Sequence, residues 1–171
     1  MTADLKQRLV ELLPDLRSFA RSLVRDPEQA DDLVQETVLR ALNALGTFKE
    51  GTNLGAWTFT ILRNHFYSQW RKQRRIDVGP ITDQTMAREH AGSAQEARLA
   101  LRDLKNAFWR LPAEQREALV LVAMRGLKYE AAAAICGCAV GTMKARVSRA
   151  RAKLQNEVMA EPKSTGKLNA T

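Results

Sequence analysis

Apolar residues recur every three or four positions along nearly the whole chain, the spacing that places side chains on one face of an α-helix. The first such run contains Leu5, Leu9, Leu12, Leu13, Leu16, Phe19, Ala20, Leu23 and Val24. Pro14 lies inside this run and should kink or divide the helix, because proline has no amide proton to donate. The alternation typical of strands is nearly absent, so the pattern predicts an all-α protein.

A second helix is expected from Asp26-Pro27, where Asp26 can cap the N-terminus and Pro27 suits the first helical position. Its apolar face is broad and should be buried, and it consists of Leu33, Val34, Thr37, Val38, Ala41, Leu42 and Leu45. Another face carries mainly acidic and amide side chains, namely Asp31, Asp32, Gln35, Glu36 and Arg40. That polar face is either a solvated surface or a docking surface for a partner, and the pattern alone favours neither.

Residues 48–53, FKEGTN, predict a loop in which Gly51 permits an unusual turn, and Thr52 or Asn53 can cap the helix that follows. The next helix, over 54–75, has two apolar faces. One carries Leu54, Trp57 and Ile61, and the nearly opposite one carries Phe59, Phe66 and Trp70 with Arg63. One face should meet the domain core, and the other should meet a different surface.

The same helix ends in the run Arg71-Lys72-Gln73-Arg74-Arg75, so that aromatic residues alternate with cations along it. This combination suits unpaired nucleic acid, because each base stacks on an aromatic ring for about 1–3 kcal/mol and the phosphates need counter-charges. For any single aromatic residue, a place in the core is the simpler interpretation.

Residues 77–93 lose the helical periodicity and hold two glycines and a proline. They predict a linker between a domain over 1–76 and a second domain over 94–159, followed by a polar, disordered tail over 160–171. In the second domain, 95–110 should form a helix that buries Leu99, Leu104, Ala107 and Phe108. Pro112 should start the next helix, whose apolar core covers 119–124 and which Gly126 should end.

The C-terminal third has the pattern of a helix-turn-helix. A short alanine-rich helix over 129–135 is followed by Cys136-Gly137-Cys138, in which Gly137 can take the positive φ of a tight turn, and Ala132 or Ala133 is small enough for the helix crossing. The helix over 139–154 then has one apolar stripe, formed by Met143, Val147, Ala150 and Leu154. The opposite side has small residues flanked by five cations and no acid: Lys144, Ala145, Arg146, Ser148, Arg149, Arg151, Ala152 and Lys153. Such a helix suits the DNA major groove.

The composition agrees with a nucleic-acid partner. The chain has 171 residues, 45% of them hydrophobic, and a formal net charge of +8. The absence of a signal peptide and of a long apolar run indicates a cytoplasmic protein without membrane attachment. Cys136 and Cys138 are better explained as small core residues than as a metal site. With two histidines, no glycine-rich phosphate loop and no paired nucleophile and base, an enzyme, a cofactor and a small-molecule substrate all lack support.

Four motifs occur in a familiar order: DDLVQETVLRAL, GAWTFTILRNHFYSQWRKQRR, LPAEQREALVL and YEAAAAICGCAVGTMKARVSRARAKL. Together they cover most of residues 20–155, and in this order the chain resembles a bacterial sigma factor of the extracytoplasmic-function (ECF) type. The segment ICGCAVGT is similar to the sequences of the subgroup that controls the general stress response. The resemblance implies two helical domains that bind core RNA polymerase and promoter DNA.

The resemblance also implies roles for residues. The polymerase clamp would dock on Asp32, Leu33, Gln35, Glu36 and Leu39. The loop with Lys49, Thr52 and Asn53 would catch a base flipped from the minus-10 element. The melted strand would be held by Arg63, Asn64, Tyr67, Arg71, Arg74 and Arg75.

The last helix would recognise the minus-35 element through Lys144, Ala145, Ser148 and Arg149, with Arg146, Arg151 and Lys153 on phosphates. Ala145 stands where the family often has a serine, so base-level specificity there is open. Members of the family are usually held inactive by an anti-sigma factor. Two alternatives remain, a stand-alone helix-turn-helix regulator, for which no dimerisation heptads are found, and a sigma-like decoy, against which the basic last helix argues.

Overall fold

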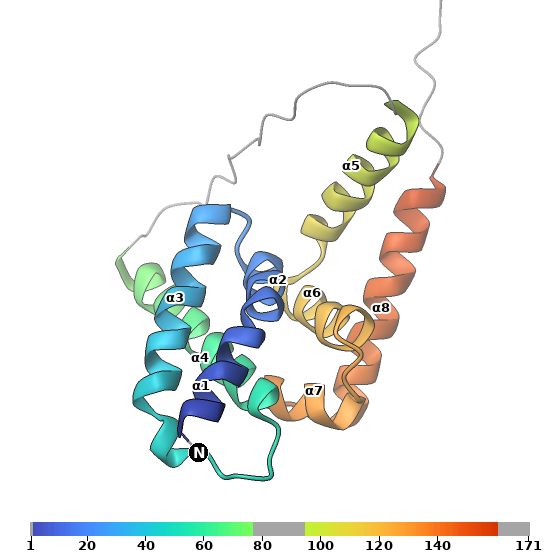
Figure 1. The fold of residues 1–171 in the computed structure, drawn as a ribbon. Helices are drawn as coiled ribbons and strands as arrows, with labels where there is room; N and C mark the ends of the chain where they lie inside the picture. Colours follow the sequence, from blue (N-terminus) through green and yellow to red (C-terminus); the bar gives the residue numbers. More distant parts are fainter. Residues whose placement is uncertain (1, 77–94, 161–171) are drawn as a thin grey trace, which may run out of the picture.

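The computed structural model describes residues 2–76 and 95–160, and in these ranges every regular element is helical (Figure 1). Side chains are described for residues 3–73 and 97–160. The predicted linker over 77–93 and the predicted tail, apart from Ala160, lie outside the described residues.

The N-terminal half contains four α-helices: α1 (Thr2–Glu11), α2 (Leu13–Leu23), α3 (Pro27–Asn43) and α4 (Leu54–Ile76), with a 3₁₀ turn, η1 (Leu45–Thr47), after α3. The break between α1 and α2 falls at Leu12, two residues before Pro14, which confirms the predicted division. Asp26 caps α3 as predicted, since its carboxylate accepts a 2.8 Å hydrogen bond from the Glu28 amide.

The C-terminal half contains α5 (Gln95–Arg110), α6 (Ala113–Leu119), α7 (Tyr129–Cys136) and α8 (Val140–Met159). A π-helical turn, η2 (Val120–Met124), continues α6. In Figure 1, α5 and the end of α8 lie side by side and extend beyond the other helices. Leu99 and Leu104 of α5 are 51% and 41% exposed, because among the described helices α5 packs chiefly against α8 alone. The prediction that both are buried was therefore wrong, as it was for Leu42, which is 36% exposed.

The two halves pack directly against each other. Helix α2 contacts α6, and α4 contacts α7. One apolar core contains Leu16, Phe19 and Leu62 from the N-terminal half together with Leu121 and Ile135 from the C-terminal half. Phe59 and Phe66, from the second apolar face predicted for the helix over 54–75, belong to this shared core, where Phe59 packs edge-on against Phe19. A separate core under α1 holds Leu5, Leu9, Ala41, Leu45, Phe48 and Leu54.

Candidate nucleic-acid interface

The turn between α7 and α8 is built around Gly137. Its φ is +63°, in the left-handed region that glycine adopts without strain. The Gly137 amide donates to the Ala134 carbonyl and the Cys138 amide to the Ala133 carbonyl, at 3.3 and 3.1 Å, so α7 ends in a paired hydrogen-bond cap. Ala132 and Ala133 are both buried where the helices cross. These contacts confirm the predicted helix-turn-helix and fix the direction of α8.

Helix α8 has one anchored face and one exposed basic face. Met143, Val147 and Ala150 are each no more than 1% exposed, as the apolar stripe predicts. The exposed side chains on the other face are Lys144, Ser148, Arg149, Arg151, Ala152 and Lys153, and Ala145 is partly buried. The helix therefore presents cations around a floor of small side chains, as insertion into a major groove requires.

Arg146 differs from the other cations of α8. Its side chain is 16% exposed and lies 3.3 Å from the Glu114 carboxylate of α6. Lys144, by contrast, is exposed, with its ammonium 5.7 Å from the centre of the Tyr129 ring. In this structure Arg146 is thus turned inward, which the charge pattern of the sequence did not indicate.

The loop before α4 keeps its polar groups at the surface. Lys49, Thr52 and Asn53 are exposed, and Gly51 has a φ of +83°. The Asn53 side chain accepts a 3.0 Å hydrogen bond from the Ala56 amide and so caps α4, as predicted. The Thr52 hydroxyl donates to the Lys49 carbonyl at 2.6 Å, which closes the loop.

Farther along α4, the residues predicted to bind a DNA strand divide into two groups. Asn64 and Arg71 are exposed. Arg63 and Tyr67 face the C-terminal half, with the Arg63 guanidinium 4.6 Å from the centre of the Tyr67 ring. The side chains of Arg74 and Arg75 lie outside the described residues.

Arg63 forms a two-pronged ion pair with Glu117 of α6. Its Nε donates to one carboxylate oxygen at 3.0 Å and its Nη2 to the other at 3.1 Å. The Glu117 side chain is fully buried, and that of Arg63 is 17% exposed. Burial raises the pKa of Glu117, although its hydrogen bonds from Arg63 act in the opposite direction. Burial alone would lower the pKa of Arg63, but the hydrogen bond and attraction to Glu117 raise it.

Burial raises the pKa values of two other groups beside this pair. The pKa of Tyr67 is raised to about 12, chiefly by desolvation. The pKa of Cys136 is likewise raised to about 12 by burial, so its thiol is a packing group rather than a reactive one. Within the described residues, no cluster of histidine, cysteine and acidic side chains could hold a metal ion.

The polar face of α3 is exposed as a strip. Asp32 and Gln35 are exposed, Glu36 is partly exposed, and Leu39 is 56% exposed. Glu36 accepts a 2.9 Å hydrogen bond from Arg40 one turn later. Leu33 lies at 5% exposure in the core, so of the five residues predicted for docking it is the one that the structure places inside.

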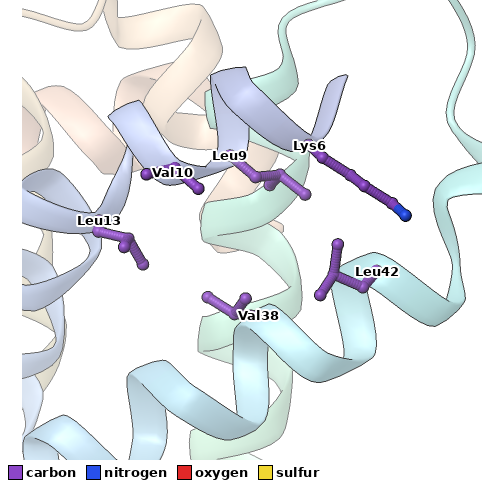
Figure 2. Close-up of a pocket in the computed structure, with 6 residues that line it drawn as sticks. All are labelled: Lys6, Leu9, Val10, Leu13, Val38 and Leu42. Atoms are coloured by element: carbon purple, nitrogen blue, oxygen red, sulfur yellow. The ribbon is translucent and has the colours of Figure 1, made fainter. Parts of the chain in front are cut away.

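An apolar hollow of about 260 Å³ lies between α1 and α3. Figure 2 shows its lining side chains, from Lys6, Leu9, Val10, Leu13, Val38 and Leu42. The sequence pattern did not predict this hollow. Its signal was the width of the apolar face of α3, which is broader than one neighbouring helix can cover.

No described helix combines the length and the apolar character that a membrane crossing needs.

Comparison with known families assigns both halves. Residues 9–76 match the model of sigma-70 region 2, and residues 101–154 match that of sigma-70 region 4. The chain belongs to the sigma-70 family of RNA polymerase sigma factors. Sigma factors of this family direct core RNA polymerase to promoters.

This sigma factor is of the ECF type. It is 49% identical over 154 residues to the ECF RNA polymerase sigma factor EcfG of Rhodopseudomonas palustris, an alignment that spans 90% of this chain and 84% of EcfG. It is similar in structure to the sigma factor RpoE of Bartonella quintana, solved with the anti-sigma factor NepR, with a TM-score of 0.78, 46% identity, and coverage of 93% and 99% of the two chains. For CnrH, solved with the cytosolic domain of CnrY, the TM-score is 0.69 and the identity 28%, over 95% of this chain and 92% of that one.

In this sigma factor, the region 2 match covers the last turn of α1 and all of α2 to α4, and the region 4 match covers the helix-turn-helix. The Arg63–Glu117 pair therefore joins region 2 to region 4.

Proposed function

We propose that this ECF sigma factor recognises promoters with two surfaces, α8 for the minus-35 element and the loop before α4 together with α4 for the minus-10 element. The observation that carries the proposal is the exposed basic face of α8 opposite an anchored apolar stripe. The turn at Gly137 fixes the direction in which α8 leaves α7.

At the minus-35 element, Lys144, Ala145, Ser148 and Arg149 face base edges in the major groove. Arg149 is the strongest candidate for a base contact, because a guanidinium can donate two parallel hydrogen bonds to guanine. Arg151 and Lys153 contact phosphates. Arg146 reaches a phosphate only when it leaves Glu114.

At the minus-10 element, the loop at Lys49, Thr52 and Asn53 receives a base that leaves the stack. Asn64 and Arg71 follow the strand along α4, and Arg63, Tyr67, Arg74 and Arg75 complete this surface. Unstacking a base costs a few kcal/mol. Stacking on aromatic rings and contacts with phosphates offset that cost. No covalent chemistry is required, so the protein acts by binding and not as an enzyme.

Core RNA polymerase docks on the exposed strip of α3 through Asp32, Gln35, Glu36 and Leu39. Leu33 supports this strip from below, since it is buried in the core. An acidic strip on a chain with a net charge of +8 keeps the protein-binding surface distinct from the DNA-binding surfaces.

We propose that an anti-sigma factor controls this chain. The genes that this chain transcribes with core polymerase belong to a stress response. Support comes from the related RpoE, which was solved in complex with NepR, and from the similarity to EcfG. The same proposal divides the chain into two domains, residues 1–76 and residues 94–159.

Reconstituted transcription tests the proposed function. Purified chain is added to core RNA polymerase with genomic DNA, and the transcripts are sequenced. We expect a defined set of start sites that share two upstream elements. DNA binding without transcripts would indicate a stand-alone regulator, and binding to an anti-sigma factor without DNA binding would indicate a decoy.

A further inference from the structure

The two halves are held together by polar contacts as well as by the shared core. Besides the Arg63–Glu117 pair, the Arg116 guanidinium of α6 donates to the Ser22 carbonyl of α2 at 3.0 Å. Arg125 pairs with Asp15 at the edge of the same interface. These contacts all join the N-terminal helices to α6 or to the segment just after η2.

The Arg63–Glu117 pair uses a residue that the proposed function needs for DNA. Arg63 and Tyr67 are covered by the C-terminal half in this structure, whereas Asn64 and Arg71 on the same helix are exposed. A guanidinium that gives two hydrogen bonds to a carboxylate cannot at the same time give them to a phosphate. The Arg63 side chain is also only 17% exposed, which leaves its remaining N–H groups little access to a strand. The packed arrangement and two-pronged strand binding by Arg63 therefore compete.

We propose that the Arg63–Glu117 ion pair is an interdomain latch, for which melted promoter DNA and the Glu117 carboxylate compete. The closed form seen here covers part of the minus-10 surface, and the open form exposes it. The latch rests on the proposed role of Arg63 in strand binding. Partners that bind the closed form weaken strand binding through it, and partners that separate the halves strengthen strand binding.

The energetics of a buried ion pair suit a latch. Removing two charges from water costs nearly as much as their attraction returns, so an intact pair adds little net stability. Opening hydrates Glu117 and gives Arg63 a new anionic partner, so both charges remain satisfied. Loss of one partner alone leaves an uncompensated charge inside the closed form. A substitution at Glu117 should therefore disfavour closure specifically.

The test compares the full-length chain with its Glu117→Gln variant, which keeps the side-chain shape and removes the charge. We expect the variant to have a larger radius of gyration in small-angle X-ray scattering. It should also bind a short single-stranded DNA pool of randomised sequence on the order of tenfold more tightly, measured by fluorescence anisotropy at one salt concentration. Adding the same DNA to the unaltered chain should expand it.

Two further variants separate the latch from general destabilisation. Glu157→Gln is the matched control, because Glu157 pairs with Arg110 at 2.8 Å within the C-terminal half, and it should change neither measurement. Asp15→Asn removes the partly exposed interdomain pair and should act in the same direction as Glu117→Gln, but more weakly. Circular dichroism shows whether each variant keeps its helices.

Two results would overturn the latch. One is a folded Glu117→Gln variant as compact as the unaltered chain, and the other is an opened variant that binds the strand no more tightly. Transcription by the unaltered chain with core polymerase tests the proposed function independently of both.

Discussion

Single residues in this structure show how burial sets protonation. His65 of α4 is 8% exposed, and burial lowers its pKa below the usual 6.5, with a further contribution from the charge of Arg40. Glu36 acts in the opposite direction but more weakly. The folded chain therefore keeps a neutral imidazole where the unfolded chain would take up a proton.

This difference predicts how stability changes with pH. Above the unfolded pKa of about 6.5, His65 makes no difference, because it is neutral in both states. As the pH falls below that value, the unfolded chain binds the extra proton, and stability declines by up to about 1.4 kcal/mol per pH unit until the folded pKa is passed. Urea unfolding over this pH range should show the decline in the unaltered chain and a shallower one in His65→Gln. Parallel curves would mean that the imidazole is not held neutral by the fold.

At the scale of single elements, the α7–α8 turn shows what one glycine contributes. A Cβ at Gly137 would meet no atom within 4 Å, so replacing it costs only the strain of an L-residue at a φ of +63°. Gly141 also has open space around it, but it lies within α8. The two glycines are thus matched in packing and differ in backbone conformation.

We expect Gly137→Ala to lower the free energy of unfolding by about 1–2 kcal/mol. Gly141→Ala should raise it by up to about 1 kcal/mol, because alanine is the better helix former. Urea denaturation of the full chain would measure both changes in the free energy of unfolding. Equal effects of the two substitutions would contradict a turn that depends on the left-handed conformation.

Helix α8 also predicts which of its cations carries sequence information. If Arg149 donates to a base, the substitution Arg149→Ala should weaken binding to the minus-35 element by about 1–3 kcal/mol. The variant should bind unrelated duplexes almost as tightly as the unaltered chain does. Lys153→Ala is the companion variant, and it should weaken binding to all duplexes alike because it contacts phosphate. Titrations at fixed salt with specific and random duplexes separate the two cases. A uniform loss with Arg149→Ala would place this residue on phosphate too.

Local patterns predicted the elements well, since caps, turns and helical spacing act within a few residues. The breaks at Pro14 and Gly137, the Asp26 and Asn53 caps, and the helix over 95–110 all agree with the structure. Burial was predicted less well. Apolar spacing shows that a face exists but not whether another element covers it, so the exposure of Leu99 and Leu104 could not be foreseen.

The candidate sites show the same limit. The exposed cations of α8 follow from its own helical pattern. The placement of Arg63 depends on a residue 54 positions away, and that of Arg146 depends on α6. Nothing within either helix indicates these partners, because a long-range ion pair leaves no periodic signal in the sequence.

At the scale of the whole molecule, basic and acidic groups lie on surfaces proposed to bind different partners. The chain as a whole carries a net charge of +8, which favours DNA, while the strip of α3 presents acidic and amide groups beside the exposed Leu39. The DNA-binding and polymerase-docking surfaces thus lie on different elements. Changing one should leave the other intact.

Glu36→Lys tests this separation. Glu36 pairs with Arg40 on the surface, with both side chains about half exposed, so loss of the pair should cost the fold no more than about 0.5 kcal/mol. The reversed charge should nevertheless weaken binding to core RNA polymerase, because it opposes the docking strip of α3. We expect an affinity loss of at least about tenfold, or about 1.4 kcal/mol, measured by fluorescence titration of labelled chain with core enzyme.

Glu11→Lys makes the same charge change at an exposed position at the end of α1 and should leave polymerase affinity unchanged. Binding of duplex DNA by the full chain should be the same in both lysine variants, since each has the same net charge and an intact α8. If Glu36→Lys and Glu11→Lys lose polymerase affinity equally, the effect is one of overall charge, and α3 is not the docking surface. If only Glu36→Lys loses it, the strip of α3 contacts the polymerase directly.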